Sequence, residues 1–233
     1  MEIKNRVVLV TGGARGLGFA MLQAFGAKGA RLVVCDQSGS DAAAESLRSL
    51  GYEATGIDCN VTEESSVVAA FEQIAARVGP VGIAVLNAGI LRDGLLIRFN
   101  KVTGKIKGKM SLEQWQSVID VNLTGVFLTG REAAAQMAEA GGGLIVPISS
   151  VAMHGNPGQS NYSAAKAGVA ALTRLWAQEL SRFQIRVCGI APGFIATEMV
   201  LRDMNAKALE EWQARIPIGR LGRPEENAHT AIF

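Results

Sequence analysis

The chain has few of the residues that build metal sites and disulfide frameworks. Its 233 residues include only three cysteines and two histidines. Cys35, Cys59 and Cys188 are far apart, odd in number and set among apolar residues, without the CxxC spacing of zinc sites. We therefore expect reduced thiols that serve packing in a cytoplasmic protein, with no metal site.

Signals for membranes and for nucleic acids are also missing. No apolar run approaches the ~20 residues of a membrane-spanning helix, and the N-terminus passes directly into a strand-like run. The formal net charge is only +2, and no basic patch is interleaved with aromatic residues. We therefore expect no membrane partner and no nucleic-acid partner.

Hydrophobic residues make up 48% of the chain, which is enough for one large core. Short apolar, β-branched runs alternate with segments of helical period, a rhythm typical of strands buried on both faces and joined by helices. It predicts an α/β fold of one domain, 1–233, with a Rossmann-type, doubly wound parallel sheet whose ligand site lies beyond the carboxyl strand ends. The six strand-like runs are 7–10, 30–35, 52–57, 82–86, 144–148 and 185–190.

Two segments interrupt this rhythm. Within about 92–110, six basic residues accompany the single acid Asp93, and Gly104 marks the tip of an expected β-hairpin. Such a charge run is usually a solvated face, but its place after a strand end suggests contact with an acidic substrate carrier. Residues 194–217 are expected to form a helical flap over the cleft.

The turn after the first strand has the spacing of a dinucleotide-binding motif. Its glycines stand between a strand and a helix, where they let the backbone approach a pyrophosphate and helix-terminal N–H groups point at it. A structural turn alone would explain one glycine, but hardly three. The residues expected to bind a dinucleotide here are Gly12, Arg15, Gly16, Leu17 and Gly18.

Two side chains near this turn favour opposite cofactors. Asp36 ends the second strand, where a carboxylate can accept hydrogen bonds from the adenosine ribose and repel a 2′-phosphate. Arg15 could meet that phosphate, or it could be a solvated turn residue paired with an acid. A carboxylate beside a phosphate costs more binding free energy than an arginine without a partner does. We therefore expect NAD(H) to be favoured, with NADP(H) as the alternative.

Polar residues follow two further strands at the same edge of the sheet. Asn60 and Val61 come after the third strand and are placed to touch the adenine, although Asn60 could equally cap the next helix. Asn87, Ala88 and Gly89 close the fourth strand. The carboxyl ends of parallel strands meet at one edge, so these residues are expected at the ligand site.

Tyr162 and Lys166 lie four residues apart in a run of small residues that favours helix, so both can point to one side. A neighbouring cation lowers the pKa of a phenol from its usual ~10 and fits it for acid–base chemistry. Judged alone, such a pair is more often a half-buried tyrosine and a snorkelling lysine than a catalytic pair. Asn122 is unfavourable inside a helix, which points to a function beyond the helix itself.

Taken together, these motifs resemble the short-chain dehydrogenase/reductase family over essentially the whole chain. Within that family, the runs 87–94 and 158–162 are similar to the β-ketoacyl-carrier-protein reductase group. The motifs that match in order and spacing are Thr11-Gly12-x-x-x-Gly16-x-Gly18, Asn87-Ala88-Gly89, Asn122, Ser150, Tyr162-x-x-x-Lys166 and Pro192-Gly193.

The resemblance implies a role for each catalytic residue. Tyr162 would donate the proton in ketone reduction, and Lys166 would lower its pKa and bind the nicotinamide ribose. Ser150 would hold the substrate oxygen; Ser149 competes for this role, but the alignment favours Ser150. Asn122 would hold a water that links Lys166 to solvent. The further cofactor contacts that it implies are Pro192, Gly193, Ile195 and Thr197.

We therefore predict an NAD(P)(H)-dependent oxidoreductase that interconverts a ketone and a secondary alcohol, with 3-oxoacyl and 3-hydroxyacyl thioesters, on an acyl carrier protein or free, as first candidates. The alternatives are a dehydrogenase of a polyol, steroid or aromatic alcohol, and a non-enzymatic nucleotide sensor. Two features differ from the carrier-protein reductase group. Asp36 favours NAD(H), whereas that group typically prefers NADP(H), and residues 138–141 lack the basic residue that the group often uses for docking. The resemblance also implies a homo-oligomer, tetramer or dimer, and a seventh strand beyond Phe233.

Overall fold

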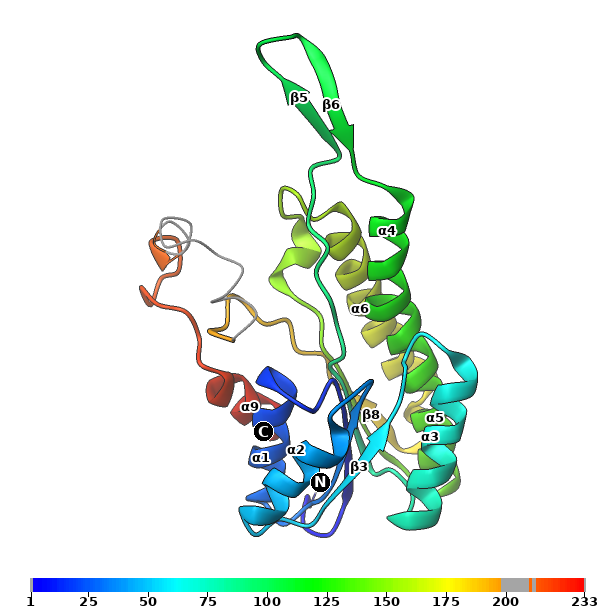
Figure 1. Cartoon of the computed structure of the whole chain (residues 1–233). Helices are drawn as coiled ribbons and strands as arrows, with labels where there is room; N and C mark the ends of the chain where they lie inside the picture. The colour runs from blue at the N-terminus through cyan, green and yellow to red at the C-terminus, as the bar shows by residue number, and fades with distance from the viewer. Residues whose placement is uncertain (1, 198–209, 211–212, 233) are drawn as a thin grey trace.

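The computed structural model describes residues 2–197, 210 and 213–232, and its centre is a parallel sheet (Figure 1). The sheet has six strands in the order β3-β2-β1-β4-β7-β8. The predicted doubly wound parallel sheet is thereby confirmed. The strands are β1 (Val7–Thr11), β2 (Arg31–Asp36), β3 (Ala54–Asp58), β4 (Ile83–Leu86), β7 (Gly143–Pro147) and β8 (Ile185–Val187).

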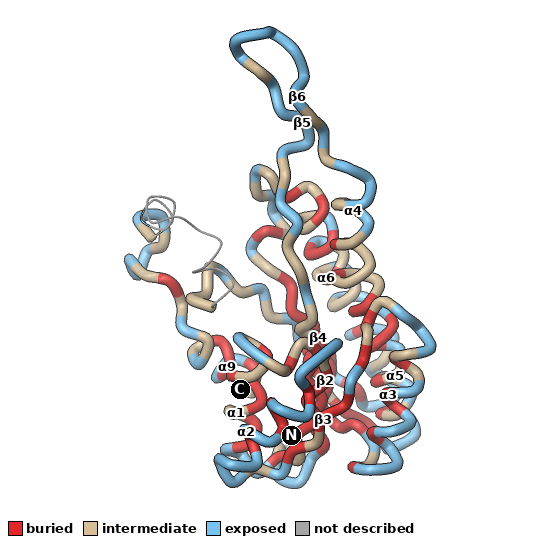
Figure 2. The backbone as a smooth tube through the Cα atoms, viewed as in Figure 1, coloured by how far each residue is buried: buried red, intermediate tan, exposed pale blue. Residues whose placement is uncertain are grey.

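Helices cover both faces of this sheet, which explains why the strands read as continuous apolar runs. Side chains alternate along a strand, so Leu9 joins the core under α3, α5 and α6, whereas Val8 and Val10 join the core under α1, α2 and α9. Figure 2 shows the buried backbone gathered at the sheet between these layers. The helices are α1 (Gly16–Gly26), α2 (Ser40–Ser49), α3 (Glu64–Arg77), α4 (Leu112–Ile119), α5 (Gly125–Glu139), α6 (Ser160–Glu179) and α9 (Pro224–Ile232).

The strand order reverses beside β1, which pairs with β2 on one side and with β4 on the other. Connections leave β1 and β4 toward opposite faces at such a point, and a crevice forms outside the carboxyl strand ends. The glycine-rich turn and the residues after β4 lie at this edge. The fold therefore brings the predicted binding residues of both strands together.

The helical segment from Ser111 to Glu139 is continuous but not uniform. Ser111 and Gln114 begin α4 with a reciprocal capping box. Between α4 and α5, residues Asp120–Thr124 form a π-helix that contains Asn122. A π-helical turn of this kind is common at functional sites.

The segment after β4 leaves the body of the molecule as an antiparallel hairpin of β5 (Ile97–Asn100) and β6 (Lys105–Lys109), drawn green in Figure 1. It forms a two-stranded sheet of its own. Most of the expected flap over 194–217 falls on residues 198–209 and 211–212, outside the described residues. The 3-10 turns are η2 (Val151–His154) and η3 (Ser181–Phe183).

The cysteines differ in their surroundings. Cys35 and Cys59 are free and buried, in keeping with a packing role. Cys188 is free but exposed, so the expectation that it serves packing is wrong. It follows β8, which is the edge strand of the sheet among the described residues. Among the described residues, no helix is long and apolar enough to span a membrane, and no group of three or more His, Cys, Asp or Glu side chains could hold a metal ion.

Candidate active site

Hydrogen bonds join the carboxyl ends of β1 and β4 and so fix the floor of the crevice. The Thr11 hydroxyl accepts from the backbone N–H of Asn87 at 3.0 Å and from that of Ala88 at 3.1 Å. In return, the Asn87 side-chain amide donates to the carbonyls of Thr11 and Gly12. Ala88 packs against the core below, whereas Gly89 is exposed.

Three glycines of the turn meet two kinds of requirement. Gly12 and Gly16 have φ angles of 63° and 55°, the left-handed region that favours glycine. A Cβ on Gly18 would overlap the carbonyl oxygen of Gly12, so only glycine permits this close approach. A Cβ on Gly16 would meet no atom within 4 Å, which leaves open space in front of the N-terminus of α1. This open, N–H-rich surface fits a pyrophosphate. Leu17, by contrast, is half-buried and packs against the core.

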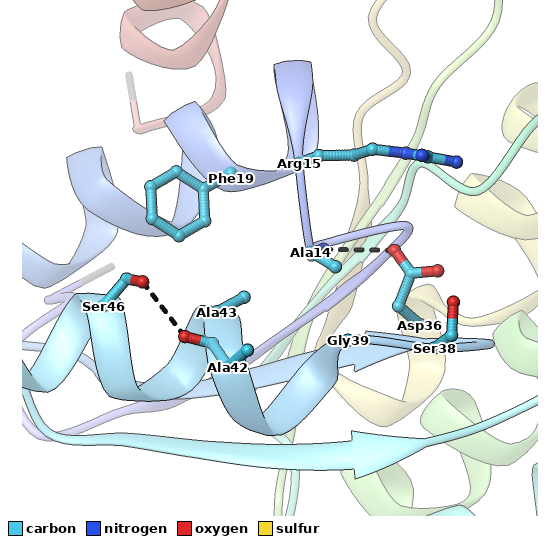
Figure 3. A pocket seen from close by; sticks show the side chains of 9 residues that line it. All are labelled: Ala14, Arg15, Phe19, Asp36, Ser38, Gly39, Ala42, Ala43 and Ser46. Carbon is cyan, nitrogen blue, oxygen red and sulfur yellow. Dashed lines mark hydrogen bonds between the residues drawn. The ribbon is translucent and has the colours of Figure 1, made fainter.

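Asp36 faces the same turn. Its carboxylate accepts from the backbone N–H of Ala14 at 3.1 Å and from that of Gln37 at 2.8 Å. Beside it, a cavity of about 440 Å³ opens between the turn and α2. Figure 3 shows Arg15 extending toward the side of this cavity where Asp36 lies. Arg15 is exposed, and its side chain forms no hydrogen bond or ion pair with any described residue, so its pairing with an acid is not observed.

The residues after β3 are committed to local structure. The Asn60 side-chain oxygen accepts from the backbone N–H and the hydroxyl of Thr62, and its amide donates to Glu63 at 2.7 Å. Val61 is buried and packs against Gly125. The side chain of Asn60 thus supports the turn before α3, but it does not cap that helix, whose N-cap is Glu63.

Tyr162 and Lys166 share one face of α6, and both are largely withdrawn from water. Lys166 is 3% exposed, and its Nζ donates to the carbonyl oxygen of Ile148 at 2.8 Å. The same Nζ lies 5.5 Å from the centre of the Tyr162 ring. The ammonium is therefore close to the phenol, but its hydrogen bond goes to the end of β7.

Burial shifts both groups toward their neutral forms. It lowers the pKa of Lys166 to about 8. Burial also raises the pKa of Tyr162. The side-chain hydrogen bond with Ser150 lowers this pKa, whereas the negative charge of Asp93 raises it further. The expected lowering of the Tyr162 pKa by Lys166 is not observed, because desolvation dominates and the ammonium is bonded to Ile148.

The free energy of unfolding should depend on pH because of the lowered pKa of Lys166. Between about pH 8 and the usual lysine pKa near ~10.4, the unfolded state keeps the proton that folded Lys166 has lost, so stability rises with pH. Relative to Lys166→Met, we expect the native protein to gain roughly 2 to 4 kcal/mol across this window. Urea unfolding at pH 7 to 10.5 measures this gain.

The exposed Lys28 gives the matched control. Its replacement, Lys28→Met, should leave the pH dependence of the unfolding free energy unchanged. Parallel curves for the native protein and Lys166→Met would show that the buried lysine does not titrate in this window.

The two serines after β7 have different surroundings. Ser149 is buried and donates its hydroxyl to the carbonyl oxygen of Lys166 at 2.8 Å. The Ser150 hydroxyl accepts from the backbone N–H of Ala152 at 3.1 Å and is the hydrogen-bond partner of Tyr162. Ser149 therefore supports α6, whereas Ser150 is the serine beside the phenol.

Asn122 is fully buried in the π-helix, and its side chain is fully engaged. Its oxygen accepts from the backbone N–H of Ile90 at 2.9 Å, and its amide donates to the Ile90 carbonyl at 3.1 Å. These bonds hold the segment after Gly89 in place. The oxygen and the nitrogen of the Asn122 side chain thus each make one bond to Ile90.

The loop after β8 borders the site from the other side. The Pro192 carbonyl accepts from the backbone N–H of Val151, next to Ser150, at 3.0 Å. Ile195 forms a β-bridge with Gly222, so the segment before α9 holds this loop. A Cβ on Gly193 would meet no atom within 4 Å, which again leaves open space. Thr197 is the last residue described in this stretch.

One buried polar residue next to Tyr162 was not singled out from the sequence. Asn161 is fully buried, and its side-chain amide donates to the carbonyls of Arg92 and Gln114, both at 3.0 Å. Its oxygen accepts from the backbone N–H of Tyr162 at 2.8 Å. Asn161 thus joins α6 to α4 and to the base of the hairpin. Its position at a helix start, directly before the tyrosine, was the available signal.

Comparison with known proteins agrees with this geometry. The family model described as short chain dehydrogenase matches residues 6–208. The 3-oxoacyl-acyl-carrier-protein reductase FabG of Thermotoga maritima is 39% identical over 241 residues, spanning 100% of this chain and 91% of the relative. The cis-4-hydroxycyclohexanecarboxylate dehydrogenase of Sinomonas cyclohexanicum is also 39% identical, over 98% of this chain and 88% of the relative.

Solved structures give the same result. A putative gluconate dehydrogenase from Agrobacterium tumefaciens superimposes with a TM-score of 0.88 at 33% sequence identity. The match covers 100% of this chain and 89% of the other. The similarity therefore extends over the sheet, both helical layers and the crevice.

Proposed function

This chain belongs to the short-chain dehydrogenase/reductase family and is an oxidoreductase of CH–OH groups that uses NAD(P)(H); from this premise we propose that it interconverts 3-oxoacyl and 3-hydroxyacyl thioesters. The observation that carries this proposal is the half-buried Tyr162 with the buried Lys166 and with Ser150 at the carboxyl edge of the sheet. The similarity to 3-oxoacyl-acyl-carrier-protein reductases supports the choice of substrate. The buried free thiols suit the reducing cytoplasm, where we place the enzyme.

The proposed roles follow from the surroundings of each side chain. When bound, the nicotinamide cofactor would supply the hydride for reduction or accept it in oxidation. Because burial keeps the Tyr162 phenol protonated, this group is suited to give its proton to a ketone oxygen. The Ser150 hydroxyl beside it would hold that oxygen by a hydrogen bond. The ammonium of Lys166, 5.5 Å from the ring, would stabilise the phenolate left behind.

The dinucleotide would bind along the carboxyl edge. Gly12, Gly16 and Gly18 would receive the pyrophosphate, because the turn offers N–H groups and open space. We propose that Asp36 takes the adenosine ribose and that the enzyme prefers NAD(H). The remaining contacts proposed are Arg15, Leu17, Asn60, Val61, Asn87, Ala88, Gly89, Pro192, Gly193, Ile195 and Thr197.

Replacing Asp36 with alanine should shift the cofactor preference toward NADPH. A unit charge near a phosphate at a surface site is worth about 1 to 3 kcal/mol, so the ratio of kcat/KM for NADPH over NADH should rise roughly 10- to 100-fold. Steady-state kinetics with both reduced cofactors measures this ratio.

Asp36 also supports the backbone N–H groups of Ala14 and Gln37, so Asp36→Asn is needed to remove the charge while keeping an acceptor. This variant should show the same shift. Asp41→Ala, which removes an exposed acid of α2, should leave the ratio unchanged. An unchanged ratio in both Asp36 variants would refute the proposed NAD(H) preference.

The similarity to the Sinomonas dehydrogenase supports a second candidate, a cyclic hydroxy acid. A panel of an acetoacetyl thioester, 4-oxocyclohexanecarboxylate and polyol-derived ketones, run with NADH and NADPH, separates the two by their kcat/KM. Turnover of the thioester at least ~100-fold above the others supports the first proposal, because that ratio corresponds to about 2.7 kcal/mol. Nucleotide binding without turnover of any ketone would instead indicate a sensor.

A further inference from the structure

The hairpin of β5 and β6 concentrates positive charge. Residues 95–110 contain five lysines and arginines and no acid, so the rest of the chain carries a net charge of −3 although the whole carries +2. The five cations are Arg98, Lys101, Lys105, Lys107 and Lys109. A stretch of one sign attracts a surface of the other sign, so a partner of the hairpin should be anionic.

The same hairpin exposes apolar side chains. Of the thirteen large hydrophobic residues that are exposed in the described part of the chain, six lie within residues 95–106. Val102 at the tip is 94% exposed, and Phe99 is 57% exposed. The others are Leu95, Leu96, Ile97 and Ile106. Lysines protect exposed strand edges from pairing, but that protection does not call for exposed apolar side chains. Such a gathering of apolar side chains marks an interaction site.

The tip of the hairpin is fixed by its own hydrogen bonds. The Asn100 side-chain oxygen accepts from the backbone N–H groups of Val102 at 2.9 Å and of Thr103 at 3.2 Å. The Asn100 carbonyl accepts from the backbone N–H of Gly104 at 2.9 Å. These donors are already bonded, so the tip can enter a less polar medium without leaving them unpaired.

Three kinds of anionic partner differ in what they offer to this surface. Nucleic acid offers phosphates, which are bound by cations and polar groups and give the exposed apolar side chains no function. An acidic protein would need a patch in which acids and apolar groups match the hairpin in shape. An anionic bilayer offers phosphates and acyl chains side by side over its whole surface. The combination of cations and exposed apolar side chains therefore favours the bilayer.

We propose that residues 95–109 bind the surface of an anionic lipid bilayer. Phe99, Val102 and Ile106 would enter the boundary between headgroups and acyl chains. The lysines beside them would lie at the phosphates, because their long side chains can extend toward polar groups. We expected no membrane partner because no apolar run of the chain can span a bilayer, but a hairpin bound at the surface needs no such run.

The base of the hairpin is attached to the candidate active site. Gly94 donates its backbone N–H to the Gly158 carbonyl at 2.8 Å, and Asn161, which precedes Tyr162, donates to the Arg92 carbonyl at 3.0 Å. From this base the hairpin projects beyond the N-terminal end of α4 (Figure 1). Binding would therefore place the start of α6, with Tyr162, on the side of the molecule that faces the bilayer.

The first test measures cosedimentation of the full chain with lipid vesicles. We expect binding to phosphatidylcholine vesicles that contain about one third phosphatidylglycerol, and little binding to phosphatidylcholine alone, because the cations need anionic headgroups. The triple variant Lys105→Glu, Lys107→Glu, Lys109→Glu should lower the partition coefficient at least ~100-fold, since the contributions of the three lysines multiply. No binding of the native protein to the anionic vesicles would overturn the proposal.

The matched control replaces Lys4, Lys28 and Arg77, three exposed cations outside the hairpin, by glutamate. It changes the net charge equally but should keep the partition coefficient within about 2-fold, because the surface potential of a bilayer decays within a Debye length. An equal loss in both triple variants would show that the charge of the whole molecule drives binding and would overturn the assignment to the hairpin.

The second test separates insertion from attraction of charge alone. The double variant Phe99→Ser, Val102→Ser leaves the charge unchanged and should lower the partition coefficient at least ~10-fold, because two apolar side chains no longer leave water. Leu50→Ser with Ile218→Ser is the control, since these two residues are 54% and 66% exposed and lie outside the hairpin. It should bind the vesicles as the native protein does.

Two further results would overturn the proposal. Full binding by the Phe99 and Val102 variant would show that the hairpin adheres by charge without entering the bilayer. Retention of duplex DNA or of a polyglutamate peptide that depends on the three lysines, without binding to vesicles, would assign the hairpin to a nucleic acid or to an acidic protein instead.

Discussion

Replacing Tyr162 with phenylalanine is expected to lower kcat for ketone reduction by about 10²- to 10⁴-fold, the usual contribution of a positioned general acid. The phenol is the only group of the pair suited to carry a proton to the substrate oxygen, because Lys166 donates to Ile148. The ring itself would remain, and its packing over the ammonium with it. Steady-state kinetics and circular dichroism together measure this loss at unchanged fold.

Tyr52 is the other tyrosine of the chain and supplies the control. Its ring packs against Gly26, far from the carboxyl strand ends, so Tyr52→Phe should retain kcat within about 2-fold, as is usual for a distant conservative change. Full turnover by Tyr162→Phe would refute the role of the phenol, and Ser150 would then be the candidate proton donor.

Replacing Gly18 with alanine is expected to raise the dissociation constant for NADH by about 10²-fold or more, since a displacement of about 1 Å at a binding site can cost that much. The new Cβ would overlap the Gly12 carbonyl and come within 2.7 Å of the Asn87 amide nitrogen. Both neighbours are backbone or are bonded to backbone, so the turn has to move. Equilibrium binding of NADH followed by its fluorescence measures the loss.

Gly82 gives the matched control, because it lies at the other end of β4. A Cβ there would come within 3.2 Å of Arg6 Cδ, the flexible part of a surface side chain that can shift. Gly82→Ala should therefore bind NADH as the native protein does. If Gly18→Ala bound NADH equally well, the turn would not be the pyrophosphate site.

The sheet could be predicted because its strands are buried on both faces. Such strands are continuous apolar runs, and the runs at β1, β2 and β4 lie within one or two residues of the observed strands. The glycine-rich turn was equally clear, because its glycines adopt left-handed backbone angles or, at Gly18, make a close approach to the Gly12 carbonyl. Local constraints of this kind leave a mark in the sequence.

Contacts between segments that are far apart in the sequence could not be predicted in this way. The sequence could not show that the ammonium of Lys166 turns to Ile148, since this depends on how β7 packs on α6. The engagement of Asn122 with Ile90 depends likewise on the π-helical turn. Asn161 was missed because its partners, Arg92 and Gln114, are far away along the chain. The sequence predicted which residues form the site better than it predicted the hydrogen bonds that they make.

The bonds between Thr11 and Asn87 have a consequence for the thermodynamics of binding. They use backbone and side-chain groups within the chain, so the crevice floor takes its shape as the protein folds. The conformational entropy of these residues is lost at that stage and need not be lost again when a ligand arrives. Calorimetry should therefore show a small entropic penalty for nucleotide association, as in a rigid, preorganised receptor.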